Sequence, residues 1–250
     1  MIYAILNMKG GVGKTTTAVN LGAALAKLGD KTLIVDLDPQ ANATAWLSTE
    51  EEAPAITMAD ALLDRKKMTS AIRKSTAKGV DIAHSSRKIA GVADDLRASS
   101  PTPAYALRNA LKQASGYERI LLDCPPGLGL LSINALIAAD VIIVPIDSQT
   151  MALAGVAQIQ ETIEELVDGE IISGPPKTTL LVTMFDSRIS LDRAVRDHLK
   201  EEGFNCFKSV IRTNTKLAEA FGLRQSIFQY SPTSTGANDY SALAKELRKK

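Results

Sequence analysis

The sequence is poor in cysteine, and its two cysteines, Cys124 and Cys206, are too few for a framework of disulfide bonds. Such usage is typical of a reducing compartment, so we expect a cytoplasmic protein. Long apolar runs are lacking too, and none approaches the ~20 residues that a membrane-spanning helix needs. The first residues are an apolar stretch and a glycine-rich run, rather than a basic segment before an apolar core, so no signal peptide is expected.

The chain also has almost no net charge, since 29 Lys and Arg residues face 28 Asp and Glu residues and leave a formal charge of +1. A global attraction to DNA or to a membrane is therefore excluded, and any binding of that kind must come from local patches. No repeat, low-complexity tract or linker divides the 250 residues. We expect one domain over residues 1–250, large enough to bury a substantial core.

Apolar stretches of strand length alternate with helical patterns along the chain. Continuous apolar runs such as 120–122 and 141–144 are typical of strands that are covered on both faces. The alternation predicts an α/β fold, doubly wound, with a mostly parallel sheet flanked by helices. The predicted strands are 2–6, 31–35, 80–83, 119–123, 141–145, 178–183 and 206–211, and the predicted helices are 15–28, 105–114, 133–138, 153–166, 191–202 and 236–248. The stretch 54–100 is the least regular, and we expect short helices and loops there.

A glycine-rich run follows the first predicted strand and opens the first predicted helix. This strand–loop–helix context is that of a phosphate-binding loop. The residues expected to bind the nucleotide phosphates are Lys9, Gly10, Gly11, Val12, Gly13, Lys14, Thr15 and Thr16. Backbone N–H groups would converge on phosphate oxygens at the helix N-terminus. Lys14 would pair with the β- and γ-phosphates of ATP, and the Thr15 hydroxyl would ligate Mg²⁺.

Lys9 places a second lysine at the start of this run, where an ordinary phosphate-binding loop needs none. The pattern resembles the deviant Walker A box of the ParA/MinD superfamily of ATPases. The runs 16–21, 38–44, 182–186, 217–220 and 231–234 resemble the small ParA/Soj proteins, so the resemblance covers almost the whole chain. It implies an ATPase that forms a homodimer around two ATP molecules, in which Lys9 reaches the nucleotide of the other subunit. A solvated surface lysine is the alternative interpretation.

Three aspartates at the ends of predicted strands complete the expected site. Asp38 matches the family residue that orients the hydrolytic water, and a carboxylate can accept a hydrogen bond from that water. Asp36 is expected nearer to Mg²⁺ and Thr15, although the two acids could instead cap the following turn. Asp123 follows the apolar run 120–122, resembles the Walker B aspartate, and is expected to hold Mg²⁺ through water. The expected catalytic residues are Lys9, Lys14, Asp38 and Asp123.

The two cysteines also allow a redox interpretation. The nitrogenase iron-protein type, a related family, bridges two subunits with an iron–sulfur cluster, which needs two cysteines per subunit at the dimer seam. Cys124 belongs to the Walker B edge, and Cys206 lies in a late strand-like run. Two buried structural thiols are therefore the preferred interpretation.

The family resemblance places the adenine pocket at Met184, Ile211 and Thr213. The chain departs from the family nearby. It has Arg-Thr-Asn at 212–214 where relatives carry Pro-Arg-Asn, and Phe221 where proline is usual. These changes lie away from the phosphate chemistry, so they bear on adenine, DNA and partner contacts rather than on hydrolysis.

Family members bind nonspecific DNA through basic residues late in the chain, which implies association with the nucleoid. Here the segment 203–218 contains no acidic residue. The residues assigned to DNA are Arg196, Lys200, Lys208, Arg212, Lys216 and Arg224. Basic residues scattered on solvated helices would look similar. A second basic stretch, 65–88, has Asp81 as its only acid and could bind DNA, bind a partner or pair internally.

The family also implies a ParB-like activator, or a functional equivalent, that sits on the cargo and stimulates hydrolysis. The cargo could be a plasmid or chromosomal centromere complex, or a protein assembly such as a carboxysome. A MinD-like membrane ATPase is the main alternative, but the late apolar stripe of Tyr240, Leu243 and Leu247 is short, and packing on the sheet is preferred to a membrane anchor. A metabolic P-loop ligase or redox ATPase is a further alternative, against which Lys9 argues.

Overall fold

The computed structural model describes residues 1–49, 54–147, 153–186, 188–189, 199 and 201–249. Within them, seven strands form one sheet with the order β3-β4-β2-β5-β1-β6-β7. The strands are β1 (Ile2–Ile5), β2 (Thr32–Asp36), β3 (Ile72–Lys74), β4 (Val80–Ala83), β5 (Arg119–Asp123), β6 (Val141–Asp147) and β7 (Lys177–Thr183). Neighbouring strands are parallel, except that β3 runs antiparallel to β4. The predicted α/β fold with a mostly parallel sheet is confirmed.

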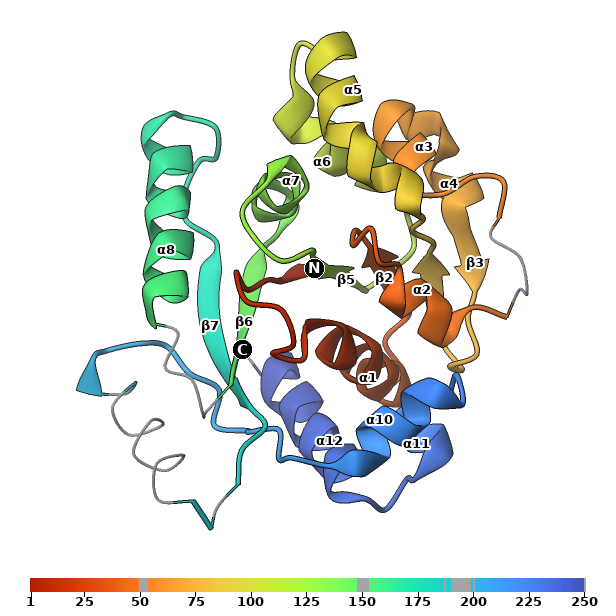
Figure 1. The fold of residues 1–250 in the computed structure, drawn as a ribbon, viewed down its shortest axis with the longest axis vertical. Coiled ribbons are helices and arrows are strands. Elements are labelled where there is room, and N and C mark those ends of the chain that lie inside the picture. Colours follow the sequence, from red (N-terminus) through yellow and green to blue (C-terminus); the bar gives the residue numbers. More distant parts are fainter. Residues whose placement is uncertain (50–53, 148–152, 187, 190–198, 200, 250) are drawn as a thin grey trace.

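Helices cover both faces of this sheet (Figure 1). One face carries α1 (Lys14–Lys27), α2 (Asn42–Leu47), α10 (Thr215–Gly222), α11 (Ile227–Tyr230) and α12 (Thr235–Arg248). The other face carries α3 (Met58–Leu63), α4 (Met68–Ala71), α5 (Val92–Ser99), α6 (Ala106–Leu111), α7 (Leu130–Ala138) and α8 (Leu153–Asp168). Short 3₁₀ turns, η1 (Arg65–Lys67), η2 (Arg87–Gly91) and η3 (Pro103–Tyr105), precede α4, α5 and α6.

Each face of the sheet has its own apolar core, because the central strands bury side chains on both sides. The last helix, α12, belongs to the core that it forms with α1. Its stripe of Tyr240, Leu243 and Leu247 is at most 6% exposed. The preferred interpretation of this stripe, packing on the sheet, is therefore confirmed. No helix in the described part of the chain has both the length and the apolarity to cross a bilayer.

The predicted strand 206–211 is wrong. This segment runs beside β7, but it forms only isolated bridges, from Cys206 to Leu180 and from Arg212 to Phe185. Between them the backbone N–H groups of Lys208 and Ser209 donate to the Glu246 carboxylate of α12, at 2.8 and 2.9 Å. These donors are therefore unavailable to β7, and the ladder is interrupted.

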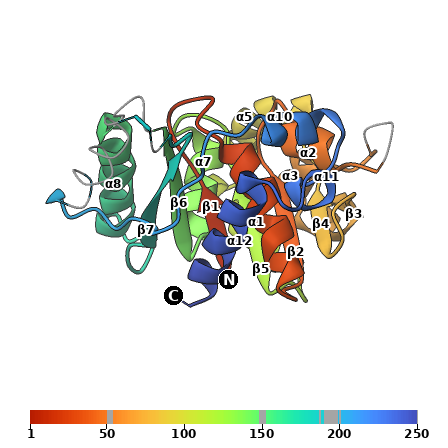
Figure 2. The ribbon, with the colours of Figure 1, turned by 90° about the horizontal axis from the view of Figure 1, so that it is seen from below.

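Other elements were predicted with shifted ends or were not predicted. The predicted helix 105–114 is η3 followed by α6, which ends at Leu111. The predicted helix 191–202 lies mostly outside the described residues. The elements that the sequence did not predict individually are β3, α2, α10, α11 and the short helices of 54–100. Both termini lie at the end of the sheet opposite the glycine-rich loop (Figure 2).

Candidate functional site

The carboxyl ends of β1, β2 and β5 meet at one edge of the sheet and bring the predicted motifs together. β1 leads into the glycine-rich loop, β2 ends at Asp36, and β5 ends at Asp123. In the sheet β5 lies between β2 and β1, so Asp36 and Asp123 stand in register. Ligands of open α/β sheets bind at such an edge.

The loop reaches α1 through glycines in the left-handed region. Gly11 has φ 78° and Gly13, the N-cap of α1, has φ 86°, which residues with a Cβ rarely adopt. A Cβ placed on Gly10 or Gly11 would meet no atom within 4 Å, so the loop is open on that side. The Val12 carbonyl accepts a hydrogen bond from Thr183 Oγ1 at 3.0 Å, which ties the loop to β7. The loop is held from behind and open in front, as phosphate binding requires.

Lys14 is buried at the first turn of α1, with 7% of its surface exposed. Its Nζ donates to the Lys9 carbonyl at 2.9 Å, so the side chain folds back along the loop. Burial lowers the pKa of Lys14, and the Asp123 and Asp38 carboxylates oppose this shift. A buried cation at the mouth of the loop is suited to phosphate oxygens.

Asp123 is fully buried, and neither of its carboxylate oxygens has a hydrogen-bond partner within the described residues. Burial raises the pKa of Asp123 well above its usual value, and the nearby charge of Asp36 adds to the shift. The Thr15 hydroxyl and Lys14 act in the opposite direction. A buried carboxylate without a donor is costly unless a cation satisfies it.

These donors fit Mg²⁺, which prefers oxygen ligands and takes few from the protein. Thr15 and Asp123 supply a hydroxyl and a carboxylate. No group of three or more His, Cys, Asp or Glu side chains with metal-binding geometry occurs in the described part of the chain. The remaining ligands would then be phosphate oxygens and water, as in nucleotide-bound Mg²⁺.

Asp36 is fully buried and uses its carboxylate to hold the segment that follows β2. Its Oδ1 accepts the backbone N–H of Asp38 at 3.1 Å, and its Oδ2 accepts the N–H and the hydroxyl of Thr44, both at 2.8 Å. Burial raises the pKa of Asp36 to about 6, and these hydrogen bonds oppose the shift. The alternative of capping the following turn is therefore realised. Its metal role stays a prediction.

Asp38 faces the cavity in front of the loop and is 9% exposed. Its Oδ1 accepts the backbone N–H of Gln40 at 2.8 Å, and its carbonyl accepts the Ser85 hydroxyl at 2.9 Å. This cavity has a volume of about 600 Å³. It is lined by Gly10, Gly11, Gly13, Lys14, Thr15, Thr16, Asp38, Pro39, Gln40, Asn42, Pro125, Pro126 and Met184.

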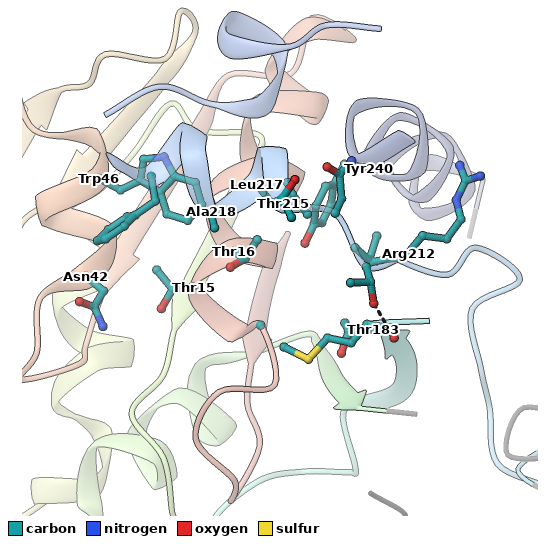
Figure 3. Close-up of a pocket in the computed structure, with 16 residues that line it drawn as sticks. Thr15, Thr16, Asn42, Trp46, Thr183, Arg212, Thr215, Leu217, Ala218 and Tyr240 are labelled. Carbon is teal, nitrogen blue, oxygen red and sulfur yellow. Dashed lines mark hydrogen bonds between the residues drawn. The ribbon is translucent and has the colours of Figure 1, made fainter. Parts of the chain in front are cut away.

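A second cavity of about 580 Å³ continues from the first and is mainly apolar (Figure 3). The three residues predicted to enclose adenine, Met184, Ile211 and Thr213, all line it. The Thr213 hydroxyl donates to the Met184 carbonyl at 3.0 Å, which links these two walls of the cavity. Further side chains that line it, and that the sequence did not assign to adenine, include Asn42, Trp46, Leu217 and Tyr240, whereas Phe221 was noted as a departure that bears on adenine contacts. For Trp46, the signal available in the sequence was that it is the only tryptophan.

Lys9 stands at the edge of the loop with its Nζ 3.8 Å from the Asp147 carboxylate at the end of β6. Its side chain is 43% exposed, so the ion pair is partly solvated. The predicted contact with a second subunit stays a prediction.

The cysteines occupy different parts of the sheet. Cys124 is buried after β5, where burial raises the pKa of its thiol, and Cys206 lies beside β7 and is only half-buried. The prediction of a buried thiol is confirmed for Cys124 and is wrong for Cys206. β1 and β6 lie between β5 and β7, so the two residues do not form one cluster.

The residues assigned to DNA do not form one free basic surface. Arg212 lines the second cavity, and its guanidinium pairs with Asp239 of α12. Lys216 pairs with Glu219 at 2.7 Å, and Lys208 and Arg224 have exposed side chains. Arg196 and Lys200 lie outside the described residues. In the stretch 65–88, Lys74 pairs with Asp81, whereas the η1 residues are exposed.

A mostly parallel sheet that carries a glycine-rich loop between an inner strand, here β1, and a helix defines a P-loop nucleoside triphosphatase. The family model described as AAA domain matches residues 1–172. The chain is 38% identical to the sporulation initiation inhibitor protein Soj of Bacillus subtilis, over 98% of this chain and 97% of that protein. It is 40% identical to the chromosome-partitioning ATPase Soj of Thermus thermophilus, over 98% of this chain and 94% of that protein.

Among solved structures, the chain is similar to cobyrinic acid a,c-diamide synthase from Mycobacterium smegmatis with bound ATP analog and magnesium. The TM-score is 0.84 at 29% identity, over 99% of this chain and 94% of that one. The extent of the match to the Soj proteins decides the family. This protein belongs to the ParA/Soj family of P-loop partition ATPases.

Proposed function

We propose that this protein is an ATP-hydrolysing dimeric switch that binds nonspecific DNA in its ATP-bound form and positions or segregates a cargo. The observation that carries the proposal is the meeting of the two-lysine loop, Asp38 and the buried Asp123 carboxylate at one edge of the sheet. The similarity to proteins named for chromosome partitioning supports it.

Hydrolysis would take place in the cavity of about 600 Å³. The loop N–H groups and Lys14 bind the β- and γ-phosphates, and Thr15 and Asp123 hold Mg²⁺. When bound, Mg²⁺ neutralises charge on the phosphate oxygens. Asp38 accepts a hydrogen bond from water and orients it toward the γ-phosphate, while Asp36 keeps the Asp38 backbone in place.

A second copy of the chain would complete the site. Lys9 leaves Asp147 and reaches the phosphates bound by the other subunit. A partly exposed ion pair at 3.8 Å contributes only about 0–1 kcal/mol, so its loss costs little. Asp38 and Pro125 also line this open cavity, so a second subunit placed over it would shield the reaction from bulk water.

The DNA surface would be formed by the exposed cations of the late chain, Lys208, Lys216 and Arg224. Arg212 is excluded from this set, because it lines the second cavity and its guanidinium pairs with the buried Asp239. Lys216, by contrast, pairs with the exposed Glu219. Dimerisation doubles the number of cations, so ATP would raise DNA affinity without new residues. A partner protein on the cargo would then stimulate hydrolysis and release the DNA.

DNA affinity measured against ATP, ADP and salt tests this function. With Mg-ATP, unrelated duplexes are expected to bind alike. Six phosphate contacts per dimer give a slope of about −5 in log affinity against log salt concentration. The triple variant of Lys208, Lys216 and Arg224 to Glu should dimerise but not bind DNA, whereas Arg65, Lys66 and Lys67 changed to Glu should leave binding unchanged. Equal binding in ATP and ADP would contradict the proposal.

Two rival functions predict other outcomes. A membrane-associated ATPase would pellet with anionic liposomes in ATP. We expect no pelleting, because the apolar stripe of α12 is buried. A ligase would turn over ATP only with an acid substrate and an amine donor. We expect hydrolysis without either.

A further inference from the structure

An aromatic pair lines the second cavity on the side of α2 and α10. Trp46 of α2 and Phe221 of α10 have ring centroids 5.2 Å apart and an interplanar angle of 76°, which is an edge-to-face contact. Trp46 is 3% exposed, whereas Phe221 is 41% exposed. Leu217 and Ala218 of the same α10 line the cavity next to this pair (Figure 3).

Trp46 also binds the backbone beyond α10. Its indole N–H donates to the Gln225 carbonyl at 2.7 Å. Gln225 follows Arg224, whose backbone is left-handed with φ 54°, so this turn has a defined shape. One side chain of α2 therefore contacts both α10 and the turn that ends it.

The same α2 also holds Asp36, which fixes the backbone of Asp38 in the first cavity. Thr44, two residues before Trp46, donates twice to Asp36, and Asp36 accepts the backbone N–H of Asp38. Asn42, the first residue of α2, lines both cavities. The helix has only six residues, so Asn42, Thr44 and Trp46 lie within two turns of one another.

We propose that Trp46 is a positioning residue that couples filling of the second cavity by a nucleotide base to the placement of Asp38. A base that enters beside Leu217 and Ala218 moves α10 as a rigid unit and carries Phe221 with it. The Trp46 ring follows, and through Thr44 and Asp36 the Asp38 backbone moves to its hydrolytic position. This coupling concerns ATP hydrolysis alone and depends on neither DNA nor a cargo partner.

The fluorescence of Trp46 tests the first half of the coupling, because this is the only tryptophan in the chain. The probes are Mg-ADP and Mg-pyrophosphate, each at a concentration that displaces a fluorescent ATP analogue from the protein. ADP should change the emission, and pyrophosphate, which has no base, should not. In Phe221→Leu the response to ADP should fall at least about twofold, because the edge-to-face contact is lost. Equal responses to the two probes would overturn the proposal.

Kinetics test the second half. Trp46→Phe keeps an aromatic wall but loses the N–H donor. We expect kcat for ATP to fall about tenfold while KM changes less than about threefold, because Trp46 loses its hydrogen bond to Gln225. Without that bond, α2 would hold Asp38 less firmly through Thr44 and Asp36. A Trp46 with a merely structural role would change thermal stability and leave kcat of the folded enzyme at the wild-type value.

Leu223→Ala is the matched control, since this neighbouring side chain is 59% exposed, and it should behave as wild type. Phe221→Leu provides a second test and should lower kcat about threefold. The effect should be smaller than that of Trp46→Phe, because an edge-to-face contact contributes about as much free energy as one hydrogen bond or less. Wild-type kcat in both the Trp46 and Phe221 variants, at wild-type melting temperature, would refute the coupling.

Discussion

Single side chains at this site carry charge in places where folding alone would not favour it. Lys14 is a buried cation with a lowered pKa, and Asp123 is a buried carboxylate with no hydrogen-bond donor among the described residues. Such residues cost stability unless a ligand of opposite charge joins them. In the proposed mechanism both meet a phosphate chain and its Mg²⁺, so the stability that they cost would be recovered when the nucleotide binds.

Asp123→Asn should therefore stabilise the nucleotide-free protein and inactivate the enzyme. The amide keeps the shape of the side chain and removes a carboxyl group whose ionisation is disfavoured by burial, and for a chain of this size each kcal/mol gained raises Tm by about 2–4 °C. The loss of a Mg²⁺ ligand should lower kcat by about two orders of magnitude. Calorimetry and phosphate release measure the two effects. Asp95→Asn, an exposed change on α5, should alter neither.

The two loop lysines should fail in different ways. Lys14→Gln removes a cation that faces the phosphates of its own subunit, so it should weaken nucleotide binding itself. Lys9→Ala should leave the affinity of the monomer for nucleotide within about threefold of wild type, since the ion pair that is lost, between Lys9 and Asp147, contributes little to the stability of the monomer. It should nevertheless abolish dimerisation and hydrolysis. Titration with a fluorescent ATP analogue separates the two. A Lys9→Ala protein that dimerises and hydrolyses ATP normally would exclude a role across the interface.

At the scale of elements, local motifs were predictable and long-range hydrogen bonds were not. The glycine-rich loop and the apolar runs of β5 and β6 are specified by neighbouring residues, so the core of the sheet and the meeting of the loop with Asp38 at its edge could be predicted from the sequence. The segment 206–211 has strand-like composition, yet its ladder is broken by Glu246, which lies about 38 residues away. Likewise α2 depends on Asp36, which binds Thr44 eight residues later.

Glu246 should therefore affect the shape of the second cavity, although it does not line that cavity. Glu246→Ala removes the acceptor of Lys208 and Ser209 and should loosen the segment that carries Ile211 and Thr213. We expect the free energy of unfolding to fall by about 1–3 kcal/mol. Relative to wild type, the affinity for ATP should fall more than the affinity for pyrophosphate. Denaturant unfolding and competition binding measure these effects. Glu164→Ala, an exposed change on α8, is the control. Unchanged affinity for both ligands would show that the segment holds its shape without this carboxylate.

At the scale of the whole molecule, ATP should determine the oligomeric state. The chain has a mass of 26.7 kDa, and light scattering should give about twice this value with Mg-ATP and the single value with ADP. Asp38→Ala leaves the loop intact but removes the acceptor that orients water, so it should remain dimeric long after wild type has returned to monomer. A mass that stays single in ATP for both proteins would rule out the two-subunit site.

The interrupted pairing beside β7 has a consequence for assembly. An open sheet offers its outer strands to other chains, and long bare edges lead to fibres. Here the outer side of β7 is occupied by the segment around Cys206 and Arg212, and at the opposite end β3 is only three residues long. Growth by strand addition is thus discouraged at both margins. A higher-order assembly of this protein is therefore expected to use helices and loops rather than strand pairing at these two margins.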